Sequence, residues 1–342
     1  MIKIGIAGFG KMGYIRALEI EKNSNTELIA VFDPNVSTHH NKNIRICSSY
    51  DELLQEDLDA VFICAYNNVN AEYTKKALMS GRHVFCEKPP ALNTTELQSV
   101  IDEEKKTNLV LKYGFNHRLH YSVMEAKKLI ASDTLGKMLW MRGVYGKAGG
   151  LEYQKNWRSH NEISGGGILI DQGIHMLDLM MYFSEQTFTQ IQSILSSSYW
   201  NAETEDNAFV TMKSENGVIA TIHSSATQWR HKFLLEMCFE KGYIDLDGIL
   251  SNSGSYAPET MTIGEREFED TTFAMGKPKE NKTWFAHDDS WALELKDFIG
   301  AIENNTKVTH GTSLDAYKAL RLVEVIYEES GFYSNNKLSK GL

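Results

Sequence analysis

Several classes of protein are excluded by what this sequence lacks. Its 342 residues include only four cysteines, with no CxxC pair, so neither a disulfide framework nor a zinc-finger pattern is expected. Cys64 and Cys86 fall in strand-like apolar runs and are expected to be reduced core thiols. No apolar run reaches membrane-spanning length, and the first residues form a strand rather than a signal peptide. We therefore expect a cytoplasmic protein.

The chain also has fewer basic residues than acidic ones, 35 against 45. The formal net charge is −10, and no basic cluster occurs. This balance argues against nucleic acid and against an anionic membrane surface as partners. The chain has no repeats and an ordinary globular composition, and its length suits two cores better than one.

The first residues predict a dinucleotide site. A short apolar strand, Ile2–Ala7, runs into Gly8-Phe9-Gly10-Lys11-Met12-Gly13, and a helical pattern follows. In such a GxGxxG turn the first glycine makes the tight bend, the second admits the pyrophosphate, and the third allows the helix to pack on the strand. The amides at the helix N-terminus then face the phosphates.

An acidic residue supports the same prediction. The next strand ends in Asp33, twenty residues beyond Gly13. A carboxylate at this position can accept hydrogen bonds from ribose hydroxyls and would repel a 2′-phosphate. The sequence therefore favours NAD over NADP.

The alternation of strands and helices continues through the first half of the chain. This pattern is typical of a doubly wound, mostly parallel sheet with its ligand at the carboxyl ends of the strands. The expected strands are 60–64, 82–86 and 109–113, and the expected helices are 51–56, 71–80 and 95–106. Residues that follow these strands are candidates for the site: Glu87-Lys88-Pro89 and Gly114-Phe115-Asn116-His117-Arg118.

Lys88 has two interpretations. It can polarise a substrate oxygen near the nicotinamide, or it can form a salt bridge with Glu87. Asn116, His117 and Arg118 are either site residues, polar rim residues or part of an interdomain hinge.

The second half of the sequence predicts an open sheet. Strand-like runs are expected at 137–145, 190–199, 208–213, 218–225, 233–239 and 243–247, and helices at 121–132, 291–303 and 314–328. We interpret the runs that follow residue 190 as one antiparallel sheet. Helices would cover one face, and self-association is the expected cover of the other.

The segment from Gly165 to Asp178, GGGILIDQGIHMLD, combines three glycines with a helical pattern that is expected to begin near Ile168. Asp171 and His175 are four residues apart, so a helix places a carboxylate and an imidazole on one face. Gly173 lies between them at a cost of about 1 kcal/mol relative to alanine, which suggests a close approach to the backbone there. The alternative is a packed helix with one satisfied His–Asp pair.

Taken together, these motifs resemble the Gfo/Idh/MocA oxidoreductase family. The resemblance rests on GFGKMG at 8–13, Asp33, EKP at 87–89, GFNHR at 114–118, the motif at 165–178, EDN at 205–207 and KGYIDLDG at 241–248. It implies a Rossmann domain at 1–118 and an α/β domain at 119–342 with an open, mostly antiparallel sheet, assembled as a homodimer or homotetramer. It also implies NAD(P)-dependent chemistry on a secondary alcohol or ketone of a sugar, cyclitol or sugar nucleotide.

The resemblance assigns site residues by position. Lys88, Asp171 and His175 correspond to the catalytic residues, with the counterpart of His175 acting as general acid/base. This role suits an imidazole, which ordinarily titrates near neutral pH. The cofactor-binding set comprises Gly8, Phe9, Gly10, Lys11, Met12, Gly13, Asp33, Ala65, Tyr66, Asn67, Glu87, Lys88 and Asn116. The substrate-binding set comprises Lys88, Asn116, Trp157, Arg158, Asp171 and His175, and no metal is expected.

Two stretches qualify the assignment. The turn at 65–70 departs from the family pattern, because Tyr66 replaces the usual proline and Asn70 the usual histidine. Trp157-Arg158 resembles members found among surface-polysaccharide and sugar-nucleotide genes. Arg158 can pair with a phosphate or carboxylate of such a substrate, or form a surface salt bridge beside a packed tryptophan.

Other functions remain open at this point. An NAD-dependent glycosidase of the same fold would oxidise its substrate transiently, with no net change in cofactor. A catalytically inactive regulator would bind nucleotide only, although it would have no need of Lys88, Asp171 and His175 together. A metal site at Asp171 and His175 ranks last, because no pattern supplies further ligands.

Overall fold

A computed structural model describes residues 1–36, 44–251, 253–267 and 278–334. The chain forms two compact units, and neither is continuous in sequence. The first unit comprises residues 1–116, 162–165 and 290–321, and the second comprises 117–161, 166–289 and 322–342. The expected boundary at 118/119 lies close to the first of these transitions, but the first unit also takes in segments from much later in the chain.

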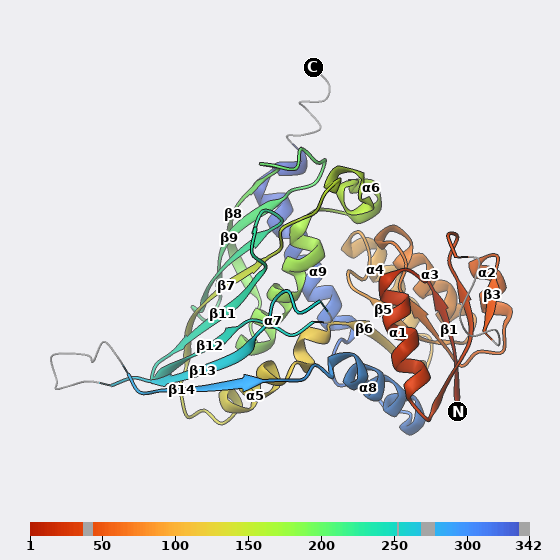
Figure 1. The fold of residues 1–342 in the computed structure, drawn as a ribbon, viewed down its shortest axis with the longest axis horizontal. Coiled ribbons are helices and arrows are strands. Elements are labelled where there is room, and N and C mark those ends of the chain that lie inside the picture. Colours follow the sequence, from red (N-terminus) through yellow and green to blue (C-terminus); the bar gives the residue numbers. More distant parts are fainter. Residues whose placement is uncertain (37–43, 252, 268–277, 335–342) are drawn as a thin grey trace, which may run out of the picture. The chain divides into compact units, whose positions relative to one another are not determined.

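The first unit contains a six-stranded sheet with the strand order β3-β2-β1-β4-β5-β6. Figure 1 labels β1, β3, β5 and β6 of this sheet. All neighbouring strands are parallel. This is the doubly wound sheet that the alternating pattern predicts. The strands are β1 (Ile2–Ala7), β2 (Thr26–Phe32), β3 (Arg45–Cys47), β4 (Ala60–Ile63), β5 (His83–Glu87) and β6 (Leu111–Gly114).

Several helices accompany this sheet, and one of them comes from the far end of the sequence. They are α1 (Lys11–Lys22), α2 (Tyr50–Gln55), α3 (Asn67–Met79), α4 (Thr94–Glu104) and α8 (Ser290–Asn304). Helix α8 contributes Leu295, Phe298 and Ile299 to the same apolar cluster as Phe62 and Phe85. The Phe298 ring meets the Phe62 ring edge-on at 5.5 Å between centroids. The core of the first unit is thus completed by residues 290–304.

The second unit contains an eight-stranded sheet with the order β14-β13-β12-β11-β7-β10-β9-β8. Most neighbours are antiparallel, as predicted, but β7 and β10 pair in parallel. Two of its strands, β13 and β14, were not predicted from the sequence. The strands are β7 (Met138–Gly146), β8 (Phe188–Ser196), β9 (Asn207–Ser214), β10 (Ile219–Ser225), β11 (Lys232–Phe239), β12 (Gly242–Asp247), β13 (Glu259–Glu265) and β14 (Glu280–Phe285).

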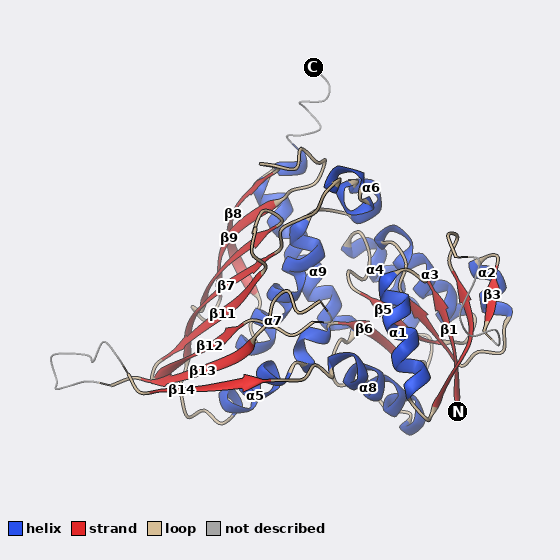
Figure 2. Cartoon of the chain, in the orientation of Figure 1, coloured by secondary structure: helices blue, strands red, loops and turns tan. Residues whose placement is uncertain are grey.

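Helices of the second unit cover one face of this sheet, and Figure 2 shows no helix of the described residues on the opposite face. The helices are α5 (Tyr121–Ala131), α6 (Asn161–Ser164), α7 (Ile174–Ser184) and α9 (Ser313–Ser330), of which α6 and α9 are shared with the first unit. Short helical turns lie at Asn116–Leu119, Tyr153–Lys155, Trp157–Ser159 and Leu169–Gly173. Among the described residues, no helix is both long and apolar enough to cross a membrane.

Candidate active site

The glycine-rich turn of the first unit has the geometry that a dinucleotide needs. Gly8 has a φ of +89°, and a Cβ there would lie 2.4 Å from the carbonyl oxygen of Cys64. A Cβ on Gly13 would lie 2.1 Å from the carbonyl oxygen of Gly8, so this glycine permits α1 to pack against the turn. Around Gly10 no heavy atom of the described residues comes within 4 Å of an added Cβ. The backbone at the second glycine is therefore open to a ligand.

Helix α1 begins directly after this turn, with Lys11 and Met12 as its first residues. Within the described structure, no side chain caps its N-terminus, and its first turn carries no acidic residue. The amides there are thus available for phosphate oxygens. Asp33 follows β2 and accepts hydrogen bonds from the amides of Phe9 at 2.7 Å and Asn35 at 2.8 Å. Its carboxylate is fixed beside the turn, as a ribose-binding acid requires.

The turn between β4 and α3 carries three of the predicted cofactor-binding residues. Ala65 follows the strand, Tyr66 is 45% exposed at the helix start, and Asn67 is buried as the first helical residue. The Asn67 side chain donates a hydrogen bond to the carbonyl of Ser164 at 2.8 Å. Asn70, which replaces the family histidine, donates to the carbonyl of Pro89 at 2.9 Å. This departure therefore holds the EKP turn in place.

Glu87 lies at the carboxyl end of β5, where its carboxylate is buried. It accepts a hydrogen bond from Arg16 Nε at 2.7 Å, and Arg16 also pairs with Glu294 at 2.6 Å. Burial raises the pKa of Glu294. Arg16 is thus the ion-pair partner that the structure gives to Glu87. Lys88 comes next in the chain and is half-buried.

Asn116 ends the first segment of the first unit. Its side chain is buried and donates to Ser290 Oγ at 3.1 Å, the hydroxyl of the first residue of α8. The predicted cofactor-side residues from Gly8 to Asn116 therefore all belong to one unit.

In the second unit, the chain is helical from Ile168 as predicted, but its first turn is not an α-helical one. Leu169–Gly173 forms a π-helical turn, and the α-helix begins only at Ile174. A π turn is wider than an α turn, so it changes the angular offset between Asp171 and His175; such turns are frequent at functional sites. The close approach expected at Gly173 is confirmed: a Cβ there would lie 3.2 Å from Ser224 Oγ of β10.

The glycines before this turn make room for Glu205. A Cβ on Gly167 would lie 2.0 Å from the Glu205 carbonyl oxygen, and one on Gly166 would lie 2.1 Å from the Tyr327 hydroxyl. The fully buried Glu205 carboxylate accepts hydrogen bonds from the amides of Gly167 at 2.8 Å and Leu169 at 3.0 Å. The hydroxyls of Tyr327 and Tyr333 donate to the same carboxylate. Glu205 therefore anchors the N-terminal end of the segment that bears Asp171 and His175.

His175 is 5% exposed and lies against a second histidine. The rings of His117 and His175 stack with centroids 3.8 Å apart and planes 15° apart. His117 Nε2 is 2.9 Å from the Tyr145 hydroxyl, and burial raises the pKa of Tyr145 well above its ordinary value. His117 is therefore a packed neighbour of the predicted acid/base and not a rim residue. Arg118, also buried, makes a two-point ion pair with Asp178 at 2.6 and 2.8 Å.

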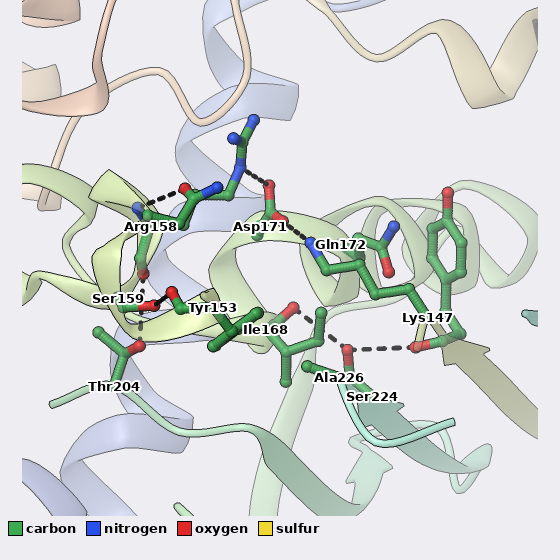
Figure 3. A network of polar contacts seen from close by, with 12 residues as sticks. Lys147, Tyr153, Arg158, Ser159, Ile168, Asp171, Gln172, Thr204, Ser224 and Ala226 are labelled. Carbon is green, nitrogen blue, oxygen red and sulfur yellow. Dashed lines mark hydrogen bonds and ion pairs between the residues drawn. The ribbon is translucent and has the colours of Figure 1, made fainter. Parts of the chain in front are cut away.

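Asp171 is held between two cations (Figure 3). Lys147 Nζ lies 2.5 Å from one carboxylate oxygen, and Arg158 Nε lies 3.2 Å from the other. The Arg158 guanidinium also packs 4.3 Å from the centre of the Trp157 ring. These residues come from three places in the chain: the end of β7, the turn at Trp157–Ser159 and the π turn.

The second unit thus brings Trp157, Arg158 and Asp171 of the predicted set into contact, and His175 follows Asp171 on the same helical segment. Sequence reasoning missed Lys147 entirely and left His117 undecided. The position of Lys147, two residues after the end of the strand predicted at 137–145, was the signal available. Within the described ranges, no cluster of three or more histidine, cysteine, aspartate or glutamate side chains could hold a metal ion.

Two family models match the chain. Residues 2–115 match the oxidoreductase family with an NAD-binding Rossmann fold, and residues 123–245 match the GFO/IDH/MocA C-terminal domain. The D-glucoside 3-dehydrogenase of Escherichia coli K12 is 28% identical over 301 residues, which cover 79% of this chain and 83% of the relative. The myo-inositol 2-dehydrogenase of Thermotoga maritima is 24% identical over 316 residues, which cover 89% of each chain.

A solved structure supports the fold. Levoglucosan dehydrogenase in complex with NADH superimposes with a TM-score of 0.82 at 18% identity, covering 96% of this chain and 97% of the other. The glycine-rich turn, the acid at the end of β2, and the DxGxH segment agree with the two family matches. The chain belongs to the Gfo/Idh/MocA family of NAD(P)-dependent oxidoreductases.

Proposed function

We propose that this oxidoreductase transfers a hydride between the nicotinamide of NAD and a secondary alcohol or ketone of a sugar, cyclitol or sugar nucleotide. The observation that carries the proposal is the buried His175 imidazole, stacked on His117 in the segment that also bears Asp171. The names of the relatives, a glucoside dehydrogenase and an inositol dehydrogenase, support the substrate class.

We assign the following roles to residues of this chain. NAD(H), when bound, supplies the hydride acceptor or donor. His175 takes the hydroxyl proton during oxidation and returns it during reduction, since loss of hydride from an alcohol carbon requires loss of that proton. Lys88 polarises the reacting oxygen, and Asp171 holds a neighbouring hydroxyl. Stacking on His117 fixes the ring plane of His175, so the proton acceptor is positioned before the substrate arrives.

A direct test follows NADH absorbance when the protein and NAD are mixed with inositols, free sugars and nucleotide sugars. NADH formation with one class would support the dehydrogenase. Hydrolysis of a chromogenic glycoside without NADH formation would favour the NAD-dependent glycosidase instead. Tight NAD binding with neither reaction would favour a regulator.

The preference for NAD is expected to depend on the charge of Asp33. In Asp33→Asn, the ratio of NADP to NAD efficiency should rise by about tenfold or more, because like charges about 4 Å apart repel by about 1–4 kcal/mol near a protein surface. The asparagine keeps an acceptor oxygen for the Phe9 amide. Steady-state kinetics with both cofactors measure the ratio, and Asp102→Asn on the surface of α4 is the matched control. A native protein that already prefers NADP would contradict this assignment.

We also propose that the helix-free face of the eight-stranded sheet mediates homo-oligomer formation. Large apolar side chains on this face are exposed, including Trp140, Ile194, Phe209 and Ile219 at 40–74%. These residues lie on four adjacent strands, since Ile194 is opposite Phe209 and Ile219 is opposite Trp140. An apolar patch of this breadth is unusual on a monomer and suits a self-complementary interface.

We expect the stability of the folded protein to depend on pH through Asp245, which lies on the same face. Burial raises the pKa of Asp245 to about 6, with contributions from Glu236 and Glu280 that exceed the opposing effect of Arg142. Because the folded pKa is raised, the folded state holds the proton more tightly, and this stabilisation is lost as the pH rises from about 4 to about 6. Asp245→Asn should therefore be more stable than the native protein above about pH 6.

Thermal unfolding of the native protein and of Asp245→Asn between about pH 4 and 8 measures this difference in stability. Sedimentation in the same buffers tests the proposed interface, because it gives the size of the assembly. The stability difference should grow up to about pH 6 and then level off. Asp247→Asn, at an exposed position on the same strand, is the control. An equal effect of both substitutions at every pH would contradict the account, and a monomer at every pH would contradict the proposed interface.

A further inference from the structure

The cluster around Asp171 carries more positive than negative charge. Lys147 and Arg158 both contact this one carboxylate, and their side chains are 19% and 37% exposed. With Asp171 ionised, the three side chains have a net charge of +1. This is unusual in a chain whose formal net charge is −10.

Two acidic residues of the second unit, Glu205 and Asp206, are engaged by other partners. Glu205 is buried and bonds to backbone amides and two tyrosines, as described above. Asp206 is also buried, and it accepts hydrogen bonds from the amides of Ser198 at 2.8 Å, Tyr199 at 2.8 Å and Trp200 at 3.0 Å. Neither residue is among the hydrogen-bonding partners of Lys147 or Arg158.

Arg158 is pre-positioned with part of its guanidinium unused. Its Nε faces Asp171, while its two terminal nitrogens point away from that carboxylate (Figure 3). Within the described residues, those terminal nitrogens have no hydrogen-bond acceptor. The backbone is fixed on both sides, because the Arg158 amide donates to Asn156 Oδ1 at 3.0 Å and its carbonyl accepts from Thr204 at 3.3 Å. The flat face of the guanidinium rests on Trp157.

Such a guanidinium is suited to bind an oxyanion. Its two terminal nitrogens match the spacing of two oxygens in a carboxylate or phosphate, and most of the ordering cost has been met before binding. Lys147 anchors the other oxygen of Asp171, so the carboxylate is not free to neutralise Arg158 alone. The backbone of Lys147 is fixed too, because the Lys147 amide donates a hydrogen bond to the carbonyl of Ser225 at 2.8 Å.

We propose that Arg158, supported by Lys147, forms an anion subsite, and that the substrate is therefore a sugar carrying a carboxylate or a phosphate. The inference rests on the proposed function and narrows it. The subsite adds a specificity contact next to Asp171, one turn before His175. Neutral sugars would lack the contact and bind more weakly.

The test compares matched pairs of compounds with the NAD-loaded protein. Glucuronate, glucose 6-phosphate and UDP-glucose are each compared with glucose, by calorimetric titration and by NADH formation. At least one anionic compound should bind more tightly than glucose, and Arg158→Gln should weaken that binding by about 10- to 100-fold, the effect of losing a hydrogen bond to a charged group. Arg158→Lys should restore part of it, because it keeps the charge and loses the planar fork.

The affinity for anionic compounds divided by the affinity for glucose distinguishes a lost anion contact from a general distortion of the site. If Arg158→Gln only misplaces Asp171, turnover falls equally for both kinds of compound and the binding ratio stays unchanged, which would overturn the subsite. Lys155→Gln is the control, because this lysine is exposed and pairs with Glu152. Preferential binding and turnover of glucose would overturn the subsite and leave the proposed function intact. Selective anion binding without turnover of any compound would support the subsite and contradict the proposed function.

Discussion

Replacement of His175 by alanine is expected to reduce turnover by about 10²–10⁴-fold, the usual contribution of a positioned general acid or base. NAD affinity should be retained, because the glycine-rich turn, α1 and Asp33 belong to the other unit of the chain. Turnover is measured from NADH absorbance, and NAD affinity by titration of the intrinsic fluorescence.

His287→Ala is the matched control, since this histidine is exposed and belongs to the same unit. It should leave both quantities unchanged. A pH profile adds a second readout: loss of the imidazole should change the pH dependence of the rate. Near-normal turnover in His175→Ala would show that another group accepts the proton.

The second large effect is expected at Gly167, which packs against the backbone of Glu205. In Gly167→Ala the new methyl group would lie 2.0 Å from the Glu205 carbonyl oxygen, a backbone atom that cannot rotate away. The segment must shift, at a cost of about 1–3 kcal/mol or more in the free energy of unfolding. Because Asp171 and His175 follow on that segment, a displacement of about 1 Å would lower turnover by about 10²-fold.

Thermal unfolding and steady-state kinetics on the same preparation test both parts of this prediction. Gly150→Ala is the control, because no heavy atom of the described structure lies within 4 Å of a Cβ added there and its φ is not in the left-handed range. If Gly167→Ala unfolds and turns over like Gly150→Ala, the packing of Glu205 against the glycines does not position the site.

Most of the fold could be predicted because its signals are local. The strand, turn and helix at 2–22 are contiguous, and so is each strand–helix pair of the first unit. The missed strands lack this kind of signal. Strand β14, ENKTWF, is almost wholly exposed at the sheet edge and shows no apolar alternation, and β3 is three residues long. The parallel pairing of β7 and β10 joins strands that are separated in sequence by α6, α7, β8 and β9, which no hairpin rule can anticipate.

The candidate site was predictable in part for the same reason. Asp171 and His175 share one motif, and Arg158 lies thirteen residues before Asp171. Their surroundings come from distant positions: Lys147 at the end of β7, Tyr145 within it, and Glu205 before β9. Glu205 accepts hydrogen bonds from amides at the start of the π turn. Apolar spacing cannot reveal such a tertiary contact, and on its own it indicated an ordinary α-helix.

The late completion of the first unit has a consequence for how the chain is made. Proteins are synthesised from the N-terminus, and domains generally fold as their residues emerge. Here the six strands of the first sheet are finished by Gly114, but α8, which packs on that sheet, starts at Ser290. Until then Phe62 and Phe85 lack Phe298, and Arg16 lacks Glu294. On the ribosome, the nucleotide-binding unit would therefore remain incomplete until most of the second unit had been translated.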